Sequence, residues 1–337
     1  MREFNAPLVL DESFDDPVPG PNEVLIRVKA CGICGTDIKI TKGLWNPNSV
    51  PMPHIPGHEF SGIVDRTGSQ VSNIGIGQRV AVYFYITCGH CRYCLSGQEN
   101  ACEQMRRPGF ELHGAYSEYV KIPASNVIPL GNNISFEQAA VLPDAVAVPY
   151  HALVQLGRMQ PGENVLIVGV GGLGVHALQI VKALGGRAIA ADIDDDRLEM
   201  SLKLGADAAV DPRNGDVVAQ IKTLTDGYGV DLCVDLVGTM ASFRWALNAT
   251  RRKGRYCLVG YSAKHPLEID TMLYHLCEWE LIGCRGSTKQ DLKTVVELTE
   301  RGMISPIIDR VYPLEDANSG LEDLDKGRIL GRGVLRI

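Results

Sequence analysis

The chain has 337 residues, which suits two domains of ordinary size better than one core. Hydrophobic residues make up 45% and charged residues 22%, an ordinary globular balance, and the formal net charge is −7. The only dense basic runs, 106–107 and 251–253, are interpreted as solvated surface. With no signal peptide or membrane-spanning run predicted, we expect a cytoplasmic protein without a nucleic-acid or membrane partner.

The first third of the chain predicts β-structure. Short apolar runs with the period-two alternation of strands are separated by glycine and proline turns, and they lie at 24–28, 61–64, 79–82 and 116–120. The pattern is typical of an all-β, barrel-like unit with long excursions. It changes near Ile134, where Ser135 is placed to N-cap a short helix.

From Asn164 onward, apolar strands alternate with helical stretches. Strands are predicted at 164–170, 187–193, 230–237 and 255–259, and helices at 175–184, 197–204 and 240–251. This alternation favours a parallel, doubly wound sheet. The tail is mixed, with a helix at 291–301 and strands at 304–311 and 333–337, and we expect it to return to the first domain.

A glycine-rich turn opens the alternating region. The residues Gly169-Val170-Gly171-Gly172-Leu173-Gly174 follow an apolar strand and begin a helix. In that context glycines permit a tight turn, backbone N–H groups approach a pyrophosphate, and the helix N-terminus favours negative charge. The alternative is a glycine turn that binds no dinucleotide.

The acidic end of the following strand predicts which dinucleotide binds. Asp192 can accept hydrogen bonds from a ribose 2′-hydroxyl and would repel a 2′-phosphate, so NAD is favoured over NADP. Arg197 lines the adenine side or permits some use of NADP. The acidic run 194–196 is interpreted as a solvated turn and helix cap rather than a metal site.

Ten cysteines in a reducing compartment are better explained as metal ligands than as disulfides. Four lie within fifteen residues at spacings that let one loop wrap a tetrahedral zinc ion: Cys88, Cys91, Cys94 and Cys102. We predict a structural zinc site there, with His90 facing solvent between two ligands. Three others are interpreted as small buried apolar residues: Cys233, Cys257 and Cys277.

A second constellation joins the segment Cys31–Asp37 with Gly57-His58-Glu59. A thiolate, an imidazole and a carboxylate are the mixed ligands of an open catalytic zinc site. Each segment alone is weak evidence for a metal site, because single cysteines and histidines are usually structural. Their combination with the cofactor turn is far more specific.

Together, Cys34-Gly35-Thr36-Asp37, Gly57-His58-Glu59, the four-cysteine loop and the glycine-rich turn resemble the zinc-containing medium-chain dehydrogenase/reductase family in order and spacing. The resemblance covers essentially the whole chain. It implies an α/β with β architecture: a GroES-like catalytic domain (1–145 and 287–337) and an inserted doubly wound Rossmann NAD-binding domain (146–286). It also implies a zinc-dependent alcohol dehydrogenase with two Zn²⁺ per chain and NAD. The expected assembly is a homodimer or homotetramer joined through sheet edges near Trp279–Arg285.

The resemblance implies ligands for the catalytic zinc. Cys34 and His58 match two of them. Asp144 looks like the aspartate ligand of bacterial secondary-alcohol dehydrogenases, although it can instead cap the following helix. Glu59 is either a fourth ligand or a neighbouring carboxylate that exchanges with water or substrate. Because Zn²⁺ with two anionic ligands is already formally neutral, we expect Glu59 to stay off the metal when substrate is bound.

The same resemblance implies roles for three residues after Cys34. Thr36 matches the position whose hydroxyl takes the alcohol proton, and Asp37 orients the zinc-site loop. Lys39 stands where a relay histidine is common, and it either relays the proton or is an exposed cation.

Other segments match the backbone that holds the cofactor, and they contain Val237, Val259, Tyr261, Ile282 and Cys284. Arg332 matches a pyrophosphate contact.

The substrate pocket is expected to involve mostly apolar or aromatic residues: Trp45, His54, Phe84, Phe110 and Leu112. This favours a small-molecule alcohol or carbonyl substrate that is secondary or bulky and hydrophobic. The alternatives are a polyol (sorbitol-type) or threonine dehydrogenase, a zinc-free enone or quinone reductase, and a non-catalytic zinc- and NAD-binding protein.

Overall fold

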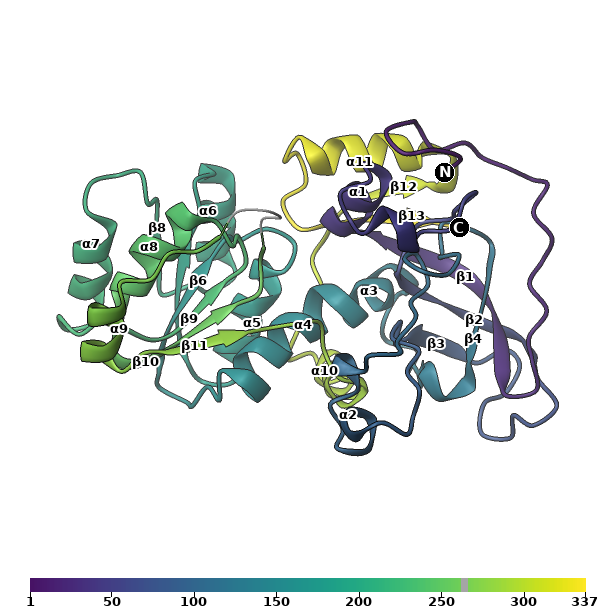
Figure 1. The fold of residues 1–337 in the computed structure, drawn as a ribbon, viewed down its shortest axis with the longest axis horizontal. Coiled ribbons are helices and arrows are strands. Elements are labelled where there is room, and N and C mark those ends of the chain that lie inside the picture. The colour runs from purple at the N-terminus through teal and green to yellow at the C-terminus, as the bar shows by residue number, and fades with distance from the viewer. Residues whose placement is uncertain (262–265) are drawn as a thin grey trace. The chain divides into compact units, whose positions relative to one another are not determined.

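The computed structural model describes residues 1–261 and 266–337, and the chain divides into two compact units. Unit 1 contains Met1–Ala147 and Ser287–Ile337, and unit 2 contains Val148–Gly286. In Figure 1, unit 1 is therefore built from the purple-to-blue and the yellow ends of the chain. The middle of the sequence forms the second unit.

Unit 1 is built around a seven-stranded sheet, with path order β12-β13-β1-β2-β3-β5 and β4 paired to β1. The strands are β1 (Glu23–Ile33), β2 (Glu59–Thr67), β3 (Arg79–Val82), β4 (Tyr119–Pro123), β5 (Val127–Pro129), β12 (Ile308–Pro313) and β13 (Arg332–Arg336). All pairs are antiparallel except β12 with β13. The predicted return of the tail to the first domain is thus confirmed, because β13 lies between β12 and β1.

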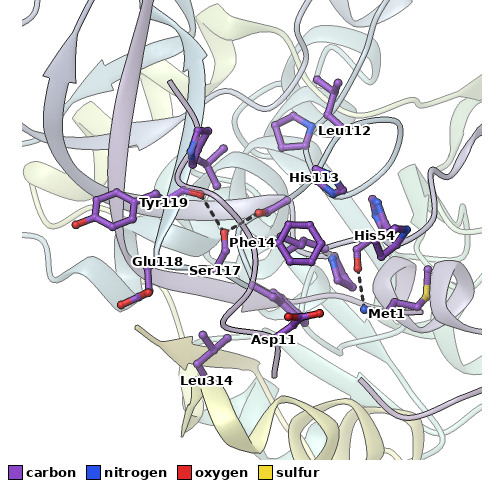
Figure 2. A pocket seen from close by; sticks show the side chains of 18 of the residues that line it. Met1, Asp11, Phe14, His54, Leu112, His113, Ser117, Glu118, Tyr119 and Leu314 are labelled. Carbon is purple, nitrogen blue, oxygen red and sulfur yellow. Dashed lines mark hydrogen bonds between the residues drawn. The ribbon is translucent and has the colours of Figure 1, made fainter. Parts of the chain in front are cut away.

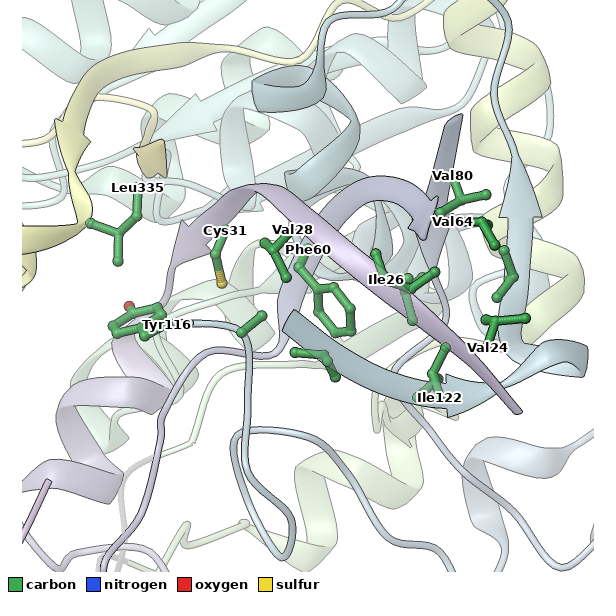
Figure 3. Close-up of a cluster of buried hydrophobic side chains, with 14 of the residues drawn as sticks. Val24, Ile26, Val28, Cys31, Phe60, Val64, Val80, Tyr116, Ile122 and Leu335 are labelled. Atoms are coloured by element: carbon green, nitrogen blue, oxygen red, sulfur yellow. The ribbon is translucent and has the colours of Figure 1, made fainter. Parts of the chain in front are cut away.

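The core of unit 1 fills the inside of this curved sheet (Figure 3). Val28, Phe60 and Ile122 are at most 1% exposed and come from three different strands. Full burial of such side chains contributes about 1.5–3 kcal/mol each. The alternating apolar pattern of the first third of the sequence is therefore the inner face of the sheet.

Short helices complete unit 1. They are α1 (Gly35–Thr41), α2 (Arg92–Leu95), α3 (Phe136–Val141), α10 (Lys289–Glu300) and α11 (Ala317–Asp325), with 3₁₀ turns at Pro47–Ser49, Glu99–Ala101, Ala124–Asn126 and Leu314–Asp316. Ser135 caps α3 as predicted, because its hydroxyl accepts from the Gln138 amide.

The helical run that α3 begins continues through residue 156. It passes through a π-helical segment, η4 (Leu142–Val146), then α4 (Ala147–Tyr150) and a second π-helical segment, η5 (His151–Leu156). By length and composition alone this run, Phe136–Leu156, could cross a membrane, but 72% of its most apolar window is buried inside the protein. Core helices of globular proteins have this character. π-Helical turns recur at functional sites, and Asp144 lies in the first one.

Unit 2 is a six-stranded, wholly parallel sheet in the order β11-β10-β9-β6-β7-β8. Its strands are β6 (Asn164–Val168), β7 (Arg187–Ala191), β8 (Ala208–Val210), β9 (Val230–Asp235), β10 (Thr250–Leu258) and β11 (Glu280–Gly283). Its helices are α5 (Gly174–Ala183), α6 (Asp195–Lys203), α7 (Val217–Leu224), α8 (Met240–Ala249) and α9 (Thr271–Cys277). This is the doubly wound order that the strand–helix alternation predicts, with the order reversing between β6 and β9.

Several predicted boundaries were wrong by two or more residues, and two of these errors have a clear physical reason. The strand predicted at 304–311 begins at Ile308, because Pro306 has no amide to donate to a ladder. The helix predicted to reach Arg251 ends at Ala249, because Thr250 already pairs with Val230 at the start of β10.

Candidate active site and cofactor-binding edge

Cys34 is held at the junction of β1 and α1. It is the N-cap of α1, where the Asp37 carboxylate accepts from its amide at 2.9 Å and its own sulfur accepts from the Thr36 amide at 3.5 Å. An acidic residue in the first turn of a helix also favours the helix dipole. Thr36 and Lys39 lie on the same helix, and burial lowers the pKa of Lys39 against the opposing charge of Cys34.

His58 is positioned by Asp37 and by the glycine before it. Its Nδ1 lies 3.2 Å from the Asp37 carboxylate, and Tyr116 donates to the other oxygen of that carboxylate at 3.2 Å. Gly57 has φ +93°, and a Cβ there would meet the Tyr116 ring at 2.3 Å. With Nδ1 engaged, Nε2 remains as the atom that faces Glu59 and Asp144, each 3.9 Å away.

Cys34, His58, Glu59 and Asp144 form a cluster whose ligand atoms all lie within 4.8 Å of one another. The Cys34 sulfur lies 3.4 Å from Asp144. The Glu59 Oε2 atom is buried and has no hydrogen-bond partner within the described ranges. Sulfur, imidazole nitrogen and carboxylate oxygen are the donors zinc takes in proteins, so this set fits a zinc ion.

The cluster also contains a buried cation, Arg332, which is 3% exposed. Its Nη2 donates to Glu59 at 2.7 Å and to Asp144 at 3.1 Å, and it lies 4.0 Å from the Cys34 sulfur. The resemblance implies a pyrophosphate contact for this arginine. In this structure its guanidinium donates to the carboxylates of the cluster, and the pyrophosphate contact stays a prediction.

Charges at the cluster favour anionic Cys34 and Asp144. Burial and the Asp144 charge oppose ionisation of Cys34, but Arg332 and His58 outweigh them and lower the pKa of the thiol. Burial likewise opposes ionisation of Asp144, yet the His58 hydrogen bond and Arg332 hold its pKa below the ordinary range. Burial raises the pKa of Glu59 well above its usual value in spite of Arg332. The pKa shifts of Cys34 and Asp144 thus favour the anionic forms that bind a metal ion, whereas the shift of Glu59 favours its protonated form.

Aromatic rings stand beside His58. Phe84 and Phe110 lie 5.2 and 4.9 Å from its ring, and Trp45 lies edge-on to Phe110 at 5.7 Å. Three of the five predicted pocket residues therefore come together next to the cluster.

The other two predicted pocket residues line a different hollow. His54 and Leu112 face a cavity of about 1100 Å³ beneath the N-terminal segment. Figure 2 shows Phe14, His54 and His113 around it. None of the four clustered ligands lines this cavity.

The four-cysteine loop closes on itself as predicted. The thiols of Cys88, Cys91, Cys94 and Cys102 approach one another at 3.5–3.8 Å, and all ten cysteines are free of disulfides. Backbone amides, first that of His90, lower the pKa of Cys88 to about 6. His90 itself is exposed and its Nδ1 lies 2.8 Å from the Cys88 carbonyl oxygen, outside the ligand set. Four thiols grouped in this way fit a closed zinc site.

Two of the three cysteines predicted to be small buried apolar residues, Cys233 and Cys257, are fully buried. Cys277, at the end of α9, is only partly buried, but it packs against the hydrophobic core of unit 2 and belongs to neither metal cluster.

In unit 2 the glycine-rich turn joins β6 to α5. A Cβ at Gly174 would lie 2.1 Å from the Gly169 carbonyl oxygen, so the close approach requires glycine. Asp192 follows β7, accepts from the Val170 amide of the turn at 2.7 Å, and lies 3.9 Å from Arg197. Asp194 caps α6 as expected from the acidic run.

The remaining predicted cofactor segments follow the carboxyl ends of neighbouring strands of the same sheet. Val237 follows β9, Val259 and Tyr261 follow β10, and Ile282 and Cys284 lie at the end of β11. Sequence reasoning missed two groups. One is Asp235, whose carboxylate accepts from the Val237 amide, and the other is the Tyr116 hydroxyl, which donates to Asp37. An aspartate that ends a buried apolar strand was the available signal for Asp235.

Comparison with known proteins agrees with this geometry. Residues 20–132 match the alcohol dehydrogenase GroES-like domain and residues 172–301 match the zinc-binding dehydrogenase family. The chain is 38% identical over 340 residues to an alcohol dehydrogenase of Geobacillus stearothermophilus, covering 100% of this chain and 98% of that protein. It is 33% identical over 344 residues to an NAD-dependent alcohol dehydrogenase of Sulfolobus acidocaldarius, with coverages of 100% and 98%.

Among solved structures, an alcohol dehydrogenase from Aeropyrum pernix matches with a TM-score of 0.93 and 31% identity, covering 100% of this chain and 98% of that one. The fold and the site define an oxidoreductase with a GroES-like and a Rossmann domain. The chain belongs to the zinc-containing alcohol dehydrogenase family.

Proposed function

We propose that this protein oxidises a secondary or bulky hydrophobic alcohol to the ketone or aldehyde, reversibly, with NAD. The observation that carries the proposal is the cluster of Cys34, His58 and Asp144 beside Glu59, with Phe84 and Phe110 against its imidazole. Aromatic walls favour hydrophobic substituents over the hydroxyls of a polyol or the charged groups of threonine.

Cys34, His58 and Asp144 would hold the catalytic ion, and Arg332 keeps Glu59 occupied by a 2.7 Å hydrogen bond. When bound there, zinc acts as a Lewis acid that lowers the pKa of an alcohol. Asp37 fixes the orientation and tautomer of His58 through Nδ1, which leaves Nε2 as the donor. Thr36 takes the alcohol proton at its hydroxyl, and Lys39 is the next group along α1 that can carry it towards solvent.

NAD, which accepts hydride at its nicotinamide, is expected at the carboxyl edge of the unit 2 sheet. The glycine-rich turn and the N-terminus of α5 bind its pyrophosphate. Asp192 receives the ribose hydroxyls and disfavours a 2′-phosphate. Relatives named as NAD-dependent alcohol dehydrogenases support this choice.

We also propose a cytoplasmic homodimer or homotetramer. β11 is an edge strand of the parallel sheet, and its outer side pairs with no described strand. The neighbouring α9 exposes large apolar side chains, among them Met272 and Leu276. Unpaired edges and apolar patches are typical of interfaces.

Metal analysis and a substrate panel test the proposal. We expect two zinc ions per chain in the wild type and one in Cys34→Ser, which keeps the four-cysteine ion. Cys31→Ala is the matched control, because this buried thiol on the strand just before Cys34 lies outside the ligand set, and the variant should keep both ions. The same proteins are then assayed with secondary, aromatic and polyhydroxy alcohols and NAD or NADP. A zinc-free wild type, or one active only on polyols, would overturn the proposal.

A further inference from the structure

Asp235 is a buried carboxylate at the carboxyl end of β9. Its side chain is 0% exposed, and no arginine, lysine or histidine forms an ion pair with it in the part of the chain that the structure describes. A buried charge without such a partner costs several kcal/mol unless hydrogen bonds compensate it. Four donors do so here, two backbone amides and two hydroxyls.

The two backbone amides belong to the loop after β9. The Val237 and Gly238 amides donate to Oδ1 at 2.8 and 3.0 Å. The Asp235 main-chain carbonyl accepts from Val259 and Gly260, both at 2.9 Å, in the loop after β10. One residue therefore anchors two neighbouring loops.

The two hydroxyls fix the rotation of the carboxylate. Tyr256 and Ser242 donate to Oδ2 at 2.6 and 3.0 Å, from β10 and from the first turn of α8. With Oδ2 held, Oδ1 must face the loop amides. The nearby N-terminus of α8 also favours the negative charge.

The loop after β9 lies where the strand order of the sheet reverses, and the loop after β10 is beside it. Leu236 donates to the Val168 carbonyl at the end of β6, and a Cβ at Gly169 would meet the Val237 side chain at 2.7 Å. Ligands of doubly wound sheets bind in the crevice at this reversal. The shape of one wall of the expected cofactor crevice thus depends on the loop that Asp235 holds against the glycine-rich turn.

We propose that Asp235 is a positioning residue for the dinucleotide. By accepting from Val237 and Gly238 through its side chain and from Val259 and Gly260 through its carbonyl, it presets both loops for binding. The inference rests on the proposed binding of NAD by unit 2, and it adds a residue that touches the loops rather than the cofactor.

The test compares three variants by NADH fluorescence titration and amide hydrogen exchange. Asp235→Ala removes all four acceptor contacts of the carboxylate and should weaken NADH binding roughly tenfold or more. Asp235→Asn keeps an oxygen for the two loop amides and should stay within about threefold of wild type. Asp231→Ala is the matched control, because Asp231 accepts the Asn164 amide at 2.8 Å at the opposite end of the same strand, and its affinity for NADH should not change.

Hydrogen exchange is measured without cofactor, so it reports on the loops even if no NADH binds. In Asp235→Ala the amides of residues 237 and 238 lose their acceptor and should lose protection, whereas those of 259 and 260 keep the main-chain carbonyl of residue 235 as their acceptor. The strands of unit 1 and the zinc content should remain unchanged. If Asp235→Ala binds NADH as tightly as wild type, or if its amides at residues 237 and 238 stay protected, the positioning role is wrong. A wild type that binds no NADH would refute the proposed function, and the exchange data would still decide whether Asp235 holds the loops.

Discussion

Replacing Arg332 by methionine should destabilise the metal-free protein far more than the zinc-loaded one. In the metal-free cluster, Arg332 makes charge-assisted hydrogen bonds to Glu59 and Asp144 at 2.7 and 3.1 Å and lies near the anionic Cys34. Removing one partner of a buried ion pair costs about 3–5 kcal/mol, because the remaining charge is left uncompensated. With zinc bound, the ion itself neutralises two of these anions, so the loss should fall to about 2 kcal/mol or less.

The assay is urea unfolding of wild type and Arg332→Met, each after chelation and after reloading with zinc. The four-cysteine site loses its ion equally in both proteins, so its contribution cancels in the difference between them. Arg336→Met is the control, because Arg336 lies on the same strand and pairs with Glu137 on the surface at 2.7 Å, where such pairs contribute at most about 1 kcal/mol. Equal destabilisation of Arg332→Met with and without zinc would refute the idea that the ion and the arginine neutralise the same anions.

Three further predictions concern other parts of unit 1. Gly57→Ala should lower the free energy of unfolding by more than about 2 kcal/mol and reduce the occupancy of the catalytic zinc, because residue 57 has φ +93° and a Cβ there would lie 2.3 Å from Tyr116. Gly75→Ala is the control and should change neither quantity, because the space around Gly75 is open. Burial lowers the pKa of His54 to about 4. Between about pH 6.5 and 4, His54 is therefore protonated in the unfolded state but neutral in the folded state. The free energy of unfolding should therefore fall by about 3 kcal/mol as the pH drops through that window, and His54→Gln should flatten the fall; an unchanged pH profile would contradict the shift. Ser135→Ala should cost about 1 kcal/mol in thermal or urea unfolding, because it removes the cap of α3, whereas a neutral effect would show that tertiary packing alone fixes that helix end.

The parts of the fold that depend on local pattern could be predicted from the sequence. Period-two alternation identified the inner face of the unit 1 sheet, and the strand–turn–helix context of Gly169–Gly174 located the cofactor edge. The four thiols of the cysteine loop lie so close in sequence that a single loop can bring them together, whatever the rest of the fold. In these cases the interacting residues are neighbours along the chain, and their chemistry is specific.

The parts that depend on distant contacts could not be predicted from the residues alone. Arg332 reaches Glu59 across 273 positions, and nothing local marks it as part of the cluster. In the sequence, Asp235 looks like any polar residue at the end of a strand. Its role is visible only in the structure, where the loops after β9 and β10 both donate hydrogen bonds to it. His54 and Trp45 are close in sequence, yet one lines the N-terminal cavity and the other contacts Phe110, because the bends between them are set by tertiary packing.

The position of β13 in the sheet has a consequence for how the protein is made. Chains emerge from the ribosome N-terminus first, and domains generally fold as units. The four-cysteine loop is complete by residue 102 and unit 2 by residue 286, but residues 30–33 of β1 have no partner on their β13 side until residues 333–336 have been synthesised. That unpaired stretch directly precedes Cys34, and Arg332 arrives on the same late strand. The cysteine loop is therefore complete early in synthesis, whereas Arg332 can join the Cys34 cluster only after an interval in which this stretch of β1 is an open strand edge, of the kind that promotes aggregation.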